Sequence, residues 1–176
     1  MSAAAPVRLS ARALEAIATH AAASADGRET GGILLGYEEN DLGAMLVMEA
    51  GNPGPNAERR PDFFRRDLTH AQRLADEALA NSGSRWIGEW HTHPGGTLAP
   101  SRTDLRTYRS FLRDPELGFS SFLAVIVGPG EEGWARPRAA AWLIEPRRIL
   151  SALLLPRAGR LELTVEGRAD RVDEGT

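Results

Sequence analysis

Residues 122–127 (FLAVIV) are apolar at every position, and this run limits the possible folds more than any other part of the sequence. A strand without a polar face belongs in the middle of a sheet that is covered on both sides. Residues 139–144 form the next apolar segment and are predicted to be the neighbouring strand. With 176 residues, the chain is long enough for one domain with a substantial core. We therefore expect a sheet between two layers of helices.

Helices and strands are predicted to alternate along most of the chain. Apolar residues at the three-and-four spacing of an amphipathic helix predict helices over residues 11–24, 62–81 and from 101 onward. Apolar runs bounded by turn residues predict strands over residues 31–37, 44–50 and 85–93. This order favours an α/β fold with three α/β/α layers and a mixed central sheet.

Two parts of the sequence do not follow this alternation. Residues 51–61 (GNPGPNAERRP) contain three prolines and two glycines, which predicts a long loop of the kind that often forms a lid. The C-terminal part has a short apolar piece over residues 149–155, a possible strand over 161–165 and a charged end that we expect to fray. We accordingly divide the chain into a main domain, residues 1–145, and a partly flexible C-terminal extension, residues 146–176.

The composition excludes several classes of function. With 24 acidic and 21 basic residues, the net charge is −3, which argues against broad electrostatic binding to nucleic acid or anionic membranes. The absence of cysteine excludes a thiol nucleophile, an iron–sulfur cluster and a thiolate zinc site. All basic residues are arginine, so Schiff-base catalysis and a Walker phosphate loop are also excluded. The alanine-rich N-terminus, residues 1–25, is interrupted by polar residues and offers no uninterrupted apolar stretch for a signal peptide or a membrane span, so we expect a cytoplasmic protein.

Two histidines and an aspartate have the spacing of a metal site. His91 and His93 are two residues apart on a predicted strand, so both imidazoles face the same side, with Cα atoms about 6–7 Å apart. Asp104 lies in the first turn of the next predicted helix, and the loop before it is long enough to return its carboxylate to the strand end. Two nitrogens and one oxygen leave the fourth position of a tetrahedral Zn²⁺ ion open to water, as in catalytic sites. We therefore predict that His91, His93 and Asp104 bind zinc.

Hydrolysis of an amide at such a site also needs a base outside the metal ligands. Glu89 lies on the same predicted strand face as the two histidines, and Glu29 lies at the start of the first long strand, before a glycine pair. The residues alone do not decide between the two glutamates. Ser101 is a candidate donor to the oxyanion, although Ser101-x-x-Asp104 is also the pattern of a helix capping box, and the two roles are compatible.

Other histidines and arginines are interpreted as structural. His20 and His70 lie on predicted helices and are expected to be structural or solvent-facing. The third helix carries a row of arginines on one side, which we expect to be a solvated face rather than a docking site. The row comprises Arg102, Arg106, Arg109 and Arg113.

Residues 91–104 (HTHPGGTLAPSRTD) resemble the motif of the JAMM or MPN+ zinc metallopeptidases, which is His-x-His, seven residues beginning with proline, and Ser-x-x-Asp. Residues 28–37 (RETGGILLGY) resemble the segment that carries the catalytic glutamate of that family. The resemblance implies that Glu29, rather than Glu89, is the base. It covers about residues 10–145 in element order and implies the α/β/α fold that the family shares with zinc deaminases.

Residues 87–94 (IGEWHTHP), and the loop residues 54–57 (GPNA) followed by Phe63 or Phe64, resemble a subgroup of the family. This subgroup consists of compact bacterial proteins that are found beside ubiquitin-like, E1-like and E2-like genes, including those of antiphage systems. The resemblance implies a zinc isopeptidase that cleaves after the C-terminal glycine of a ubiquitin-like protein, in deconjugation or in precursor processing. An extended substrate tail is expected to add as a strand beside the site. The alternatives are a processing peptidase for a sulfur-carrier protein of ubiquitin-like fold and a non-catalytic MPN scaffold.

Overall fold

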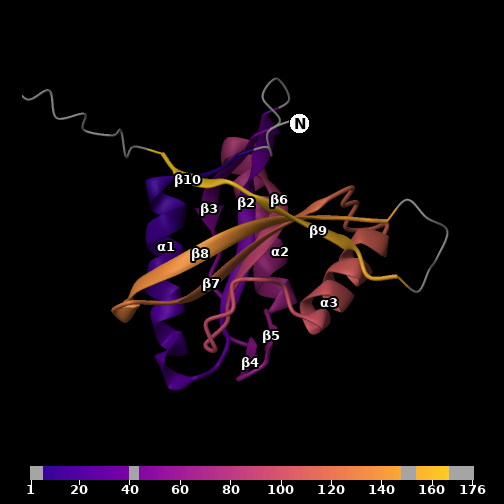
Figure 1. The fold of residues 1–176 in the computed structure, drawn as a ribbon. Coiled ribbons are helices and arrows are strands. Elements are labelled where there is room, and N and C mark those ends of the chain that lie inside the picture. Colours follow the sequence, from indigo (N-terminus) through magenta and orange to yellow (C-terminus); the bar gives the residue numbers. More distant parts are fainter. Residues whose placement is uncertain (1–5, 40–43, 148–153, 167–176) are drawn as a thin grey trace, which may run out of the picture.

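The computed structural model describes residues 6–39, 44–147 and 154–166. A mixed sheet runs through the molecule in the order β10-β1-β3-β2-β6-β7-β8-β9 (Figure 1). Its strands are β1 (Val7–Leu9), β2 (Gly31–Glu39), β3 (Ala44–Ala50), β6 (Arg85–Thr92), β7 (Phe122–Gly130), β8 (Gly133–Glu145), β9 (Arg157–Leu161) and β10 (Leu163–Val165). A separate hairpin is formed by β4 (Glu58–Arg60) and β5 (Phe63–Arg65).

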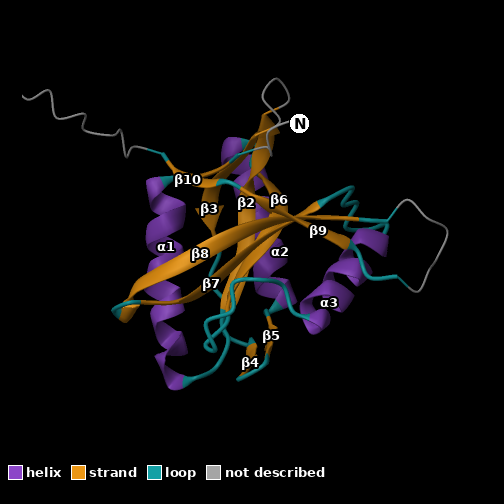
Figure 2. Ribbon diagram, in the orientation of Figure 1, coloured by secondary structure: helices purple, strands orange, loops and turns teal. Residues whose placement is uncertain are grey.

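Helices cover both faces of the sheet (Figure 2). They are α1 (Ala11–Ala21), which continues into a 3₁₀ turn over Ala22–Asp26, α2 (Leu68–Ser82) and α3 (Arg102–Arg113). Strand β7 shows the arrangement, since Leu123 and Val125 pack in the cluster that contains Ile17 of α1, whereas Phe122 packs with Tyr108 of α3. Helix α2 lies against β2 through a third cluster. The predicted three-layer α/β/α fold with a mixed sheet is therefore confirmed.

The ends of the helices follow from local sequence signals. Ser10 caps α1 by accepting a hydrogen bond from the Ala13 amide, as its position before the apolar stripe predicts. Asp67 caps α2 by accepting a hydrogen bond from the His70 amide, and Gly83 ends α2 in the left-handed region at φ 73°.

The prediction of a helix that begins at residue 62 was wrong. Phe64 is in phase with the apolar stripe of α2, but Phe63 to Arg65 form β5, which pairs with β4. Asp67 then starts the helix at Leu68, because a side chain that accepts from the backbone three residues on favours a cap over a helix interior. The predicted loop over residues 51–61 accordingly contains β4. The Arg60 carbonyl accepts a hydrogen bond from the Glu29 amide, so the hairpin is tied to the segment before β2.

The C-terminal part of the described chain takes part in the sheet. The strand predicted over residues 161–165 is divided at Glu162 between two strands: β9 pairs with β8, and β10 pairs with β1 at the other end of the strand order. Because only one residue separates β9 from β10, this segment brings the two edges of the sheet together, and the sheet curls. Strand β1 was not predicted, since three residues are too few to show a period.

Three expectations are not decided by these observations. The division of the chain at residue 145 stays a prediction. Most of the apolar piece over residues 149–155 and the charged end after residue 166 lie outside the described residues.

Among the described residues, every helix is too short or too polar to cross a membrane.

Candidate metal centre

His91 and His93 meet at the end of β6, in the middle of the sheet. Strand β6 lies between β2 and β7, and the His93 amide donates to the Val127 carbonyl, so both neighbours hold the strand end in place. Both side chains are buried, and their Nε2 atoms lie 2.9 Å apart. The alternation of side chains along the strand thus produces the convergence that the His-x-His spacing predicted.

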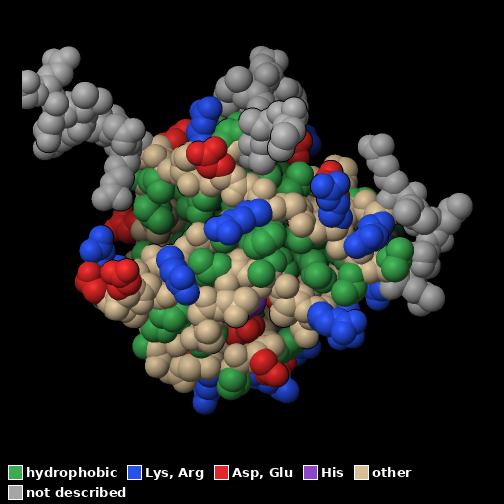
Figure 3. Space-filling view, viewed as in Figure 1, with side chains coloured by type: hydrophobic (Ala, Val, Ile, Leu, Met, Phe, Trp, Pro, Cys, Tyr) green, Lys and Arg blue, Asp and Glu red, His purple; other side chains and the backbone are tan. Residues whose placement is uncertain are grey.

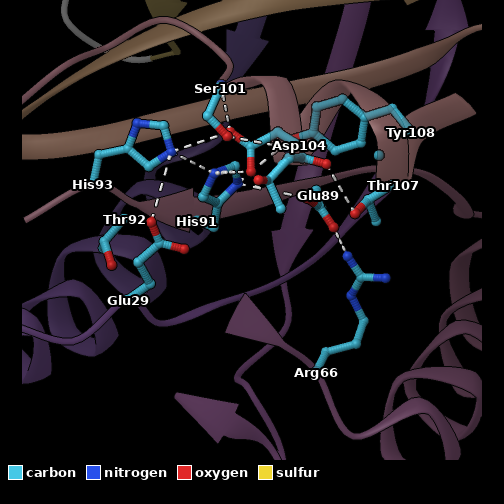
Figure 4. A network of polar contacts seen from close by, with 12 residues as sticks. Glu29, Arg66, Glu89, His91, Thr92, His93, Ser101, Asp104, Thr107 and Tyr108 are labelled. Atoms are coloured by element: carbon cyan, nitrogen blue, oxygen red, sulfur yellow. Dashed lines mark hydrogen bonds and ion pairs between the residues drawn. The ribbon is translucent and has the colours of Figure 1, made fainter. Parts of the chain in front are cut away.

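Asp104 in the first turn of α3 completes the cluster. Its Oδ1 lies 3.5 Å from Nε2 of His91, and its Oδ2 lies 3.3 Å from Nε2 of His93. Figure 4 shows the carboxylate pointing at the two imidazoles. The structure therefore brings together the three residues that were predicted as metal ligands.

The distances in this cluster fit a tetrahedral metal ion. Two donors that each lie about 2.0–2.1 Å from zinc are about 3.3–3.4 Å apart at the tetrahedral angle. The two Nε2 atoms lie 2.9 Å apart, and each is close to a different Asp104 oxygen: Oδ1 lies 3.5 Å from His91 and Oδ2 lies 3.3 Å from His93. A set of two imidazole nitrogens and one carboxylate oxygen is also the set that catalytic zinc uses with its fourth position open.

The hydrogen bond of His93 supports the same interpretation. Its Nδ1 lies 2.8 Å from the Thr97 carbonyl oxygen, which can only accept, so Nδ1 carries the proton. In the neutral ring, Nε2 then carries no proton, and its unshared electron pair faces both His91 and the Asp104 carboxylate. Electron pairs that converge in this way are stabilised by a cation at their centre.

Asp104 is ionised despite its partial burial. Desolvation opposes the charge, but the contacts with His91 and His93 and a hydrogen bond with Ser101 outweigh it and hold the pKa well below the ordinary value for aspartate. The Ser101 amide donates to Oδ2 of Asp104 at 2.6 Å, and Ser101 Oγ accepts from the Asp104 amide at 3.1 Å. The predicted capping box is therefore formed, and it holds the carboxylate in place.

Glu29 lies beside the cluster, on the side of His93. Its Oε1 is 4.0 Å from Nε2 of His93, and the side chain is buried. Burial raises the pKa of Glu29 to about 7, with the two histidines opposing the shift and Asp104 reinforcing it. Gly31 allows the chain to enter β2 here, because a side chain at this position would collide with the Trp90 carbonyl and with His91. The position and the pKa suit a group that exchanges protons near neutral pH.

Glu89, the other candidate base, is differently placed. It forms an ion pair with Arg66, and its Oε1 lies 3.5 Å from Nδ1 of His91, the ring nitrogen that faces away from the cluster (Figure 4). The hydroxyl of Tyr108 lies 3.4 Å from the same nitrogen. Sequence reasoning missed Arg66, Thr97 and Tyr108, and no spacing or composition signal singles them out.

A cavity of about 500 Å³ opens beside the cluster. It lies between the β4–β5 hairpin, the start of α2 and α3, and the space-filling view shows acidic and histidine atoms at the bottom of a hollow (Figure 3). Its apolar wall includes Phe63, Phe64, Leu68 and Phe111. Glu29, His91 and Asp104 also line it, so the cluster can be reached by a substrate.

The residues interpreted as structural do not belong to the metal cluster. His20 and His70 are both half-buried and are not part of the metal cluster. In the arginine row of α3, Arg102, Arg106 and Arg113 are exposed.

The comparisons with known proteins agree with this geometry. The chain is 33% identical to the "CD-NTase/cGAS isopeptidase" of Enterobacter hormaechei over 111 residues, which cover 60% of this chain and 58% of that protein. It is 31% identical to "Probable metalloprotease y4qB" of Sinorhizobium fredii over 140 residues, or 78% and 82% of the two chains. The chain thus matches little more than half the length of the Enterobacter protein.

A solved structure and a family profile complete the comparison. Protein DSY2949 from Desulfitobacterium hafniense has the same fold, with a TM-score of 0.65 and 19% identity over 97% of this chain and 99% of that one. The profile of the Prok-JAB family, described as prokaryotic homologs of the JAB domain, matches residues 10–144. This range contains Glu29, both histidines, Ser101 and Asp104, and it confirms the resemblance to JAMM or MPN proteins. The chain therefore belongs to the Prok-JAB family.

Proposed function

We propose that the protein is a zinc-dependent peptidase that cleaves the peptide or isopeptide bond after the C-terminal glycine of a ubiquitin-like protein. The observation that carries the proposal is the convergence of His91, His93 and Asp104 beside a buried glutamate, at the edge of an open cavity. The names of the two relatives, an isopeptidase and a metalloprotease, support the same class of reaction. A bond of the isopeptide kind joins the C-terminus of one protein to a side-chain amine of another, which is why a ubiquitin-like partner is proposed.

In this proposal, each residue of the site has one task. His91, His93 and Asp104 hold zinc, which when bound supplies a Lewis acid and a more acidic water. Glu29 takes the proton of the attacking water and returns it to the leaving amine. Ser101 donates its hydroxyl hydrogen to the oxyanion, since its oxygen already accepts from the Asp104 amide and the hydrogen remains free for a second bond.

The role of Ser101 can be separated from its role as a cap. Ser101→Ala removes both the hydroxyl and the cap, and is expected to cost about 0.5–2 kcal/mol of stability. Ser101→Gly also removes the hydroxyl but costs only a few tenths of a kcal/mol, because glycine is tolerated at this position. If Ser101 serves the oxyanion, both variants lose about 10²–10³-fold in kcat. Full activity of the Gly variant, measured beside thermal unfolding of both, would leave Ser101 as a cap alone.

The proposed function is tested with paired substrates. A linear fusion at the C-terminal glycine of a ubiquitin-like protein and the same protein joined through an isopeptide bond to a lysine peptide are incubated with the zinc-loaded enzyme. We expect cleavage at the glycine, loss of cleavage with a zinc chelator, and recovery when zinc is added back. Faster cleavage of the isopeptide bond identifies deconjugation, and faster cleavage of the linear fusion identifies precursor or sulfur-carrier processing. If the zinc-loaded protein cleaves neither substrate, a non-catalytic scaffold is favoured.

The biological setting belongs to the same proposal. E1-like and E2-like proteins are the partners that the sequence resemblance implies for a deconjugating enzyme, and they stay a prediction. The isopeptidase name of one relative supports the type of bond that is cleaved. A role in an antiphage conjugation system and a cytoplasmic location remain predictions from the sequence. The identity of the neighbouring genes tests the role in conjugation, since sulfur-assimilation genes in place of E1-like and E2-like genes would favour the trimming reaction.

A further inference from the structure

A buried ion pair lies next to the metal centre, and the proposed mechanism does not use it. Arg66, between β5 and the cap of α2, pairs with Glu89 of β6, and the two side chains are only 9% and 7% exposed. The guanidinium carbon lies 5.6 Å from the centre of the Trp86 ring and 5.1 Å from that of Phe111. Arg66 therefore contacts two aromatic rings, and its charge is directed at Glu89 (Figure 4).

Stability alone does not account for this pair. Removing two charges from water costs several kcal/mol per ion, and apolar residues of similar volume are often as stabilising as a buried pair or more so. Burial lowers the pKa of Arg66 to about 10, which still leaves the guanidinium charged at neutral pH. The two aromatic contacts contribute cation–π attraction that offsets part of the desolvation cost. We therefore expect the pair to act on a neighbouring group.

The neighbour of the pair is Nδ1 of His91. Glu89 Oε1 lies 3.5 Å from this nitrogen, and the Tyr108 hydroxyl lies 3.4 Å from it. Two neutral tautomers of His91 are conceivable. With the proton on Nδ1, an N–H group points toward the Glu89 carboxylate, and Nε2 carries an unshared electron pair that can bind a metal ion. With the proton on Nε2, that atom donates to the bare Nε2 of His93 at 2.9 Å, and its Nδ1 lone pair faces a carboxylate.

The charge on Glu89 favours the Nδ1–H tautomer, and it acts against the Asp104 carboxylate, whose Oδ1 lies at the same distance, 3.5 Å, from Nε2 of His91. A cation held by Nε2 and Asp104 would remove that competition, because it takes the lone pair and offsets the Asp104 charge. A carboxylate attracts an N–H group and repels a lone pair, and the effect is strong because all of these groups are buried. Arg66 stabilises the Glu89 carboxylate from its other side. The contact between Glu89 and His91 is longer than an ideal hydrogen bond, so the orienting force is electrostatic rather than a short bond.

We propose that Arg66 and Glu89 are positioning residues, which hold the proton of His91 on Nδ1 and thereby keep Nε2 free to bind the metal ion. The inference rests on the proposed metal centre, but it concerns two residues to which that proposal gives no task. It also gives separate tasks to the two glutamates between which the residues alone do not decide: Glu29 lies beside Nε2 of His93, where a metal ion would be held, and Glu89 lies beside Nδ1 of His91.

The first test is zinc affinity, measured by competition with a chromophoric chelator. Glu89→Gln keeps a group that can accept from Nδ1 but removes the charge, and is expected to weaken zinc binding by about 10–100-fold, as other outer partners of metal-binding histidines do. Arg66→Gln is expected to weaken it in the same direction, since the carboxylate loses its counter-charge. The double variant is expected to bind no more weakly than Glu89→Gln, because Arg66 acts through Glu89.

Two matched variants show whether these effects are specific. Arg73→Gln breaks the exposed pair with Glu77 on α2, and is expected to leave zinc affinity unchanged. Tyr108→Phe removes the other group near Nδ1, and a larger loss there than in Glu89→Gln would assign the positioning role to the tyrosine. If Arg66→Gln and Glu89→Gln lower only the unfolding temperature and bind zinc as the wild type does, the pair is structural and the inference is wrong.

The second test needs no variant and no metal. Two-dimensional ¹H–¹⁵N NMR of the imidazole nitrogens in the metal-free wild-type protein reports which ring nitrogen carries the proton. We expect His91 as the Nδ1–H tautomer; a dominant Nε2–H form would overturn the inference even if Glu89→Gln does not fold. The two proposals fail separately, since a wild-type protein that binds no zinc removes the metal centre, whereas one that binds zinc equally with and without the Glu89 charge removes only the positioning role.

Discussion

Replacing Glu29 with glutamine is expected to slow cleavage by about 10²–10⁴-fold while zinc binding stays close to that of the wild type. Glutamine has nearly the same shape, but it cannot take a proton from water. Burial holds the pKa of the Glu29 carboxyl group at about 7, so the wild-type side chain can both accept a proton and return it near neutral pH. Since Glu29 lies 4.0 Å from the nearest imidazole nitrogen, its loss leaves the three proposed ligands in place.

The measurement combines single-turnover cleavage with zinc content by elemental analysis. Asp62→Asn is a suitable control, because Asp62 is an exposed carboxylate that adds to the raised pKa of Glu29 and lies outside the metal cluster. The control is expected to stay within about threefold of the wild type, the range typical of surface substitutions. Unchanged cleavage by Glu29→Gln would remove Glu29 from the mechanism, and loss of zinc in that variant would make it a ligand rather than a base.

The central features of the fold could be predicted because they depend on local patterns. The fully apolar run in β7 indicates burial on both faces, and the structure places its alternate residues against α1 and α3. The His-x-His spacing indicates convergence because a strand repeats every two residues. The pattern Ser101-x-x-Asp104 indicates a capping box, which orients the same carboxylate that the metal site needs.

The features that were missed depend on contacts between distant segments. Arg66 and Glu89 are far apart in sequence, and only the packing of the β5–α2 connection against β6 brings them together. The β4–β5 hairpin was taken for loop and helix because its strands are too short to show alternation and because Phe64 continues the period of the helix that follows. A pattern within one segment likewise cannot predict that β9 and β10 lie at opposite edges of the sheet.

The capping box also makes possible a substitution that separates the metal site from the fold. Asp104→Asn keeps an oxygen that can accept from the Ser101 amide, so α3 is expected to remain capped. The amide lacks the charge that faces both imidazoles at 3.3–3.5 Å. Zinc affinity is therefore expected to fall by well over the roughly 10–100-fold that the loss of an outer partner costs.

Cleavage is expected to disappear with the metal in Asp104→Asn, while the circular dichroism of the metal-free protein stays that of the wild type. Asp114→Asn at the other end of α3 is the matched control, since this aspartate lies outside the metal cluster and its variant is expected to bind zinc and cleave normally. His93→Ala is expected to lose zinc as well, because it removes one of the two nitrogens. Stoichiometric zinc in both Asp104→Asn and His93→Ala at wild-type affinity would show that the ion binds elsewhere, and the proposed mechanism would then lose its centre. Loss of zinc in both, with the fold intact, assigns the metal to the point where the end of β6 meets the first turn of α3.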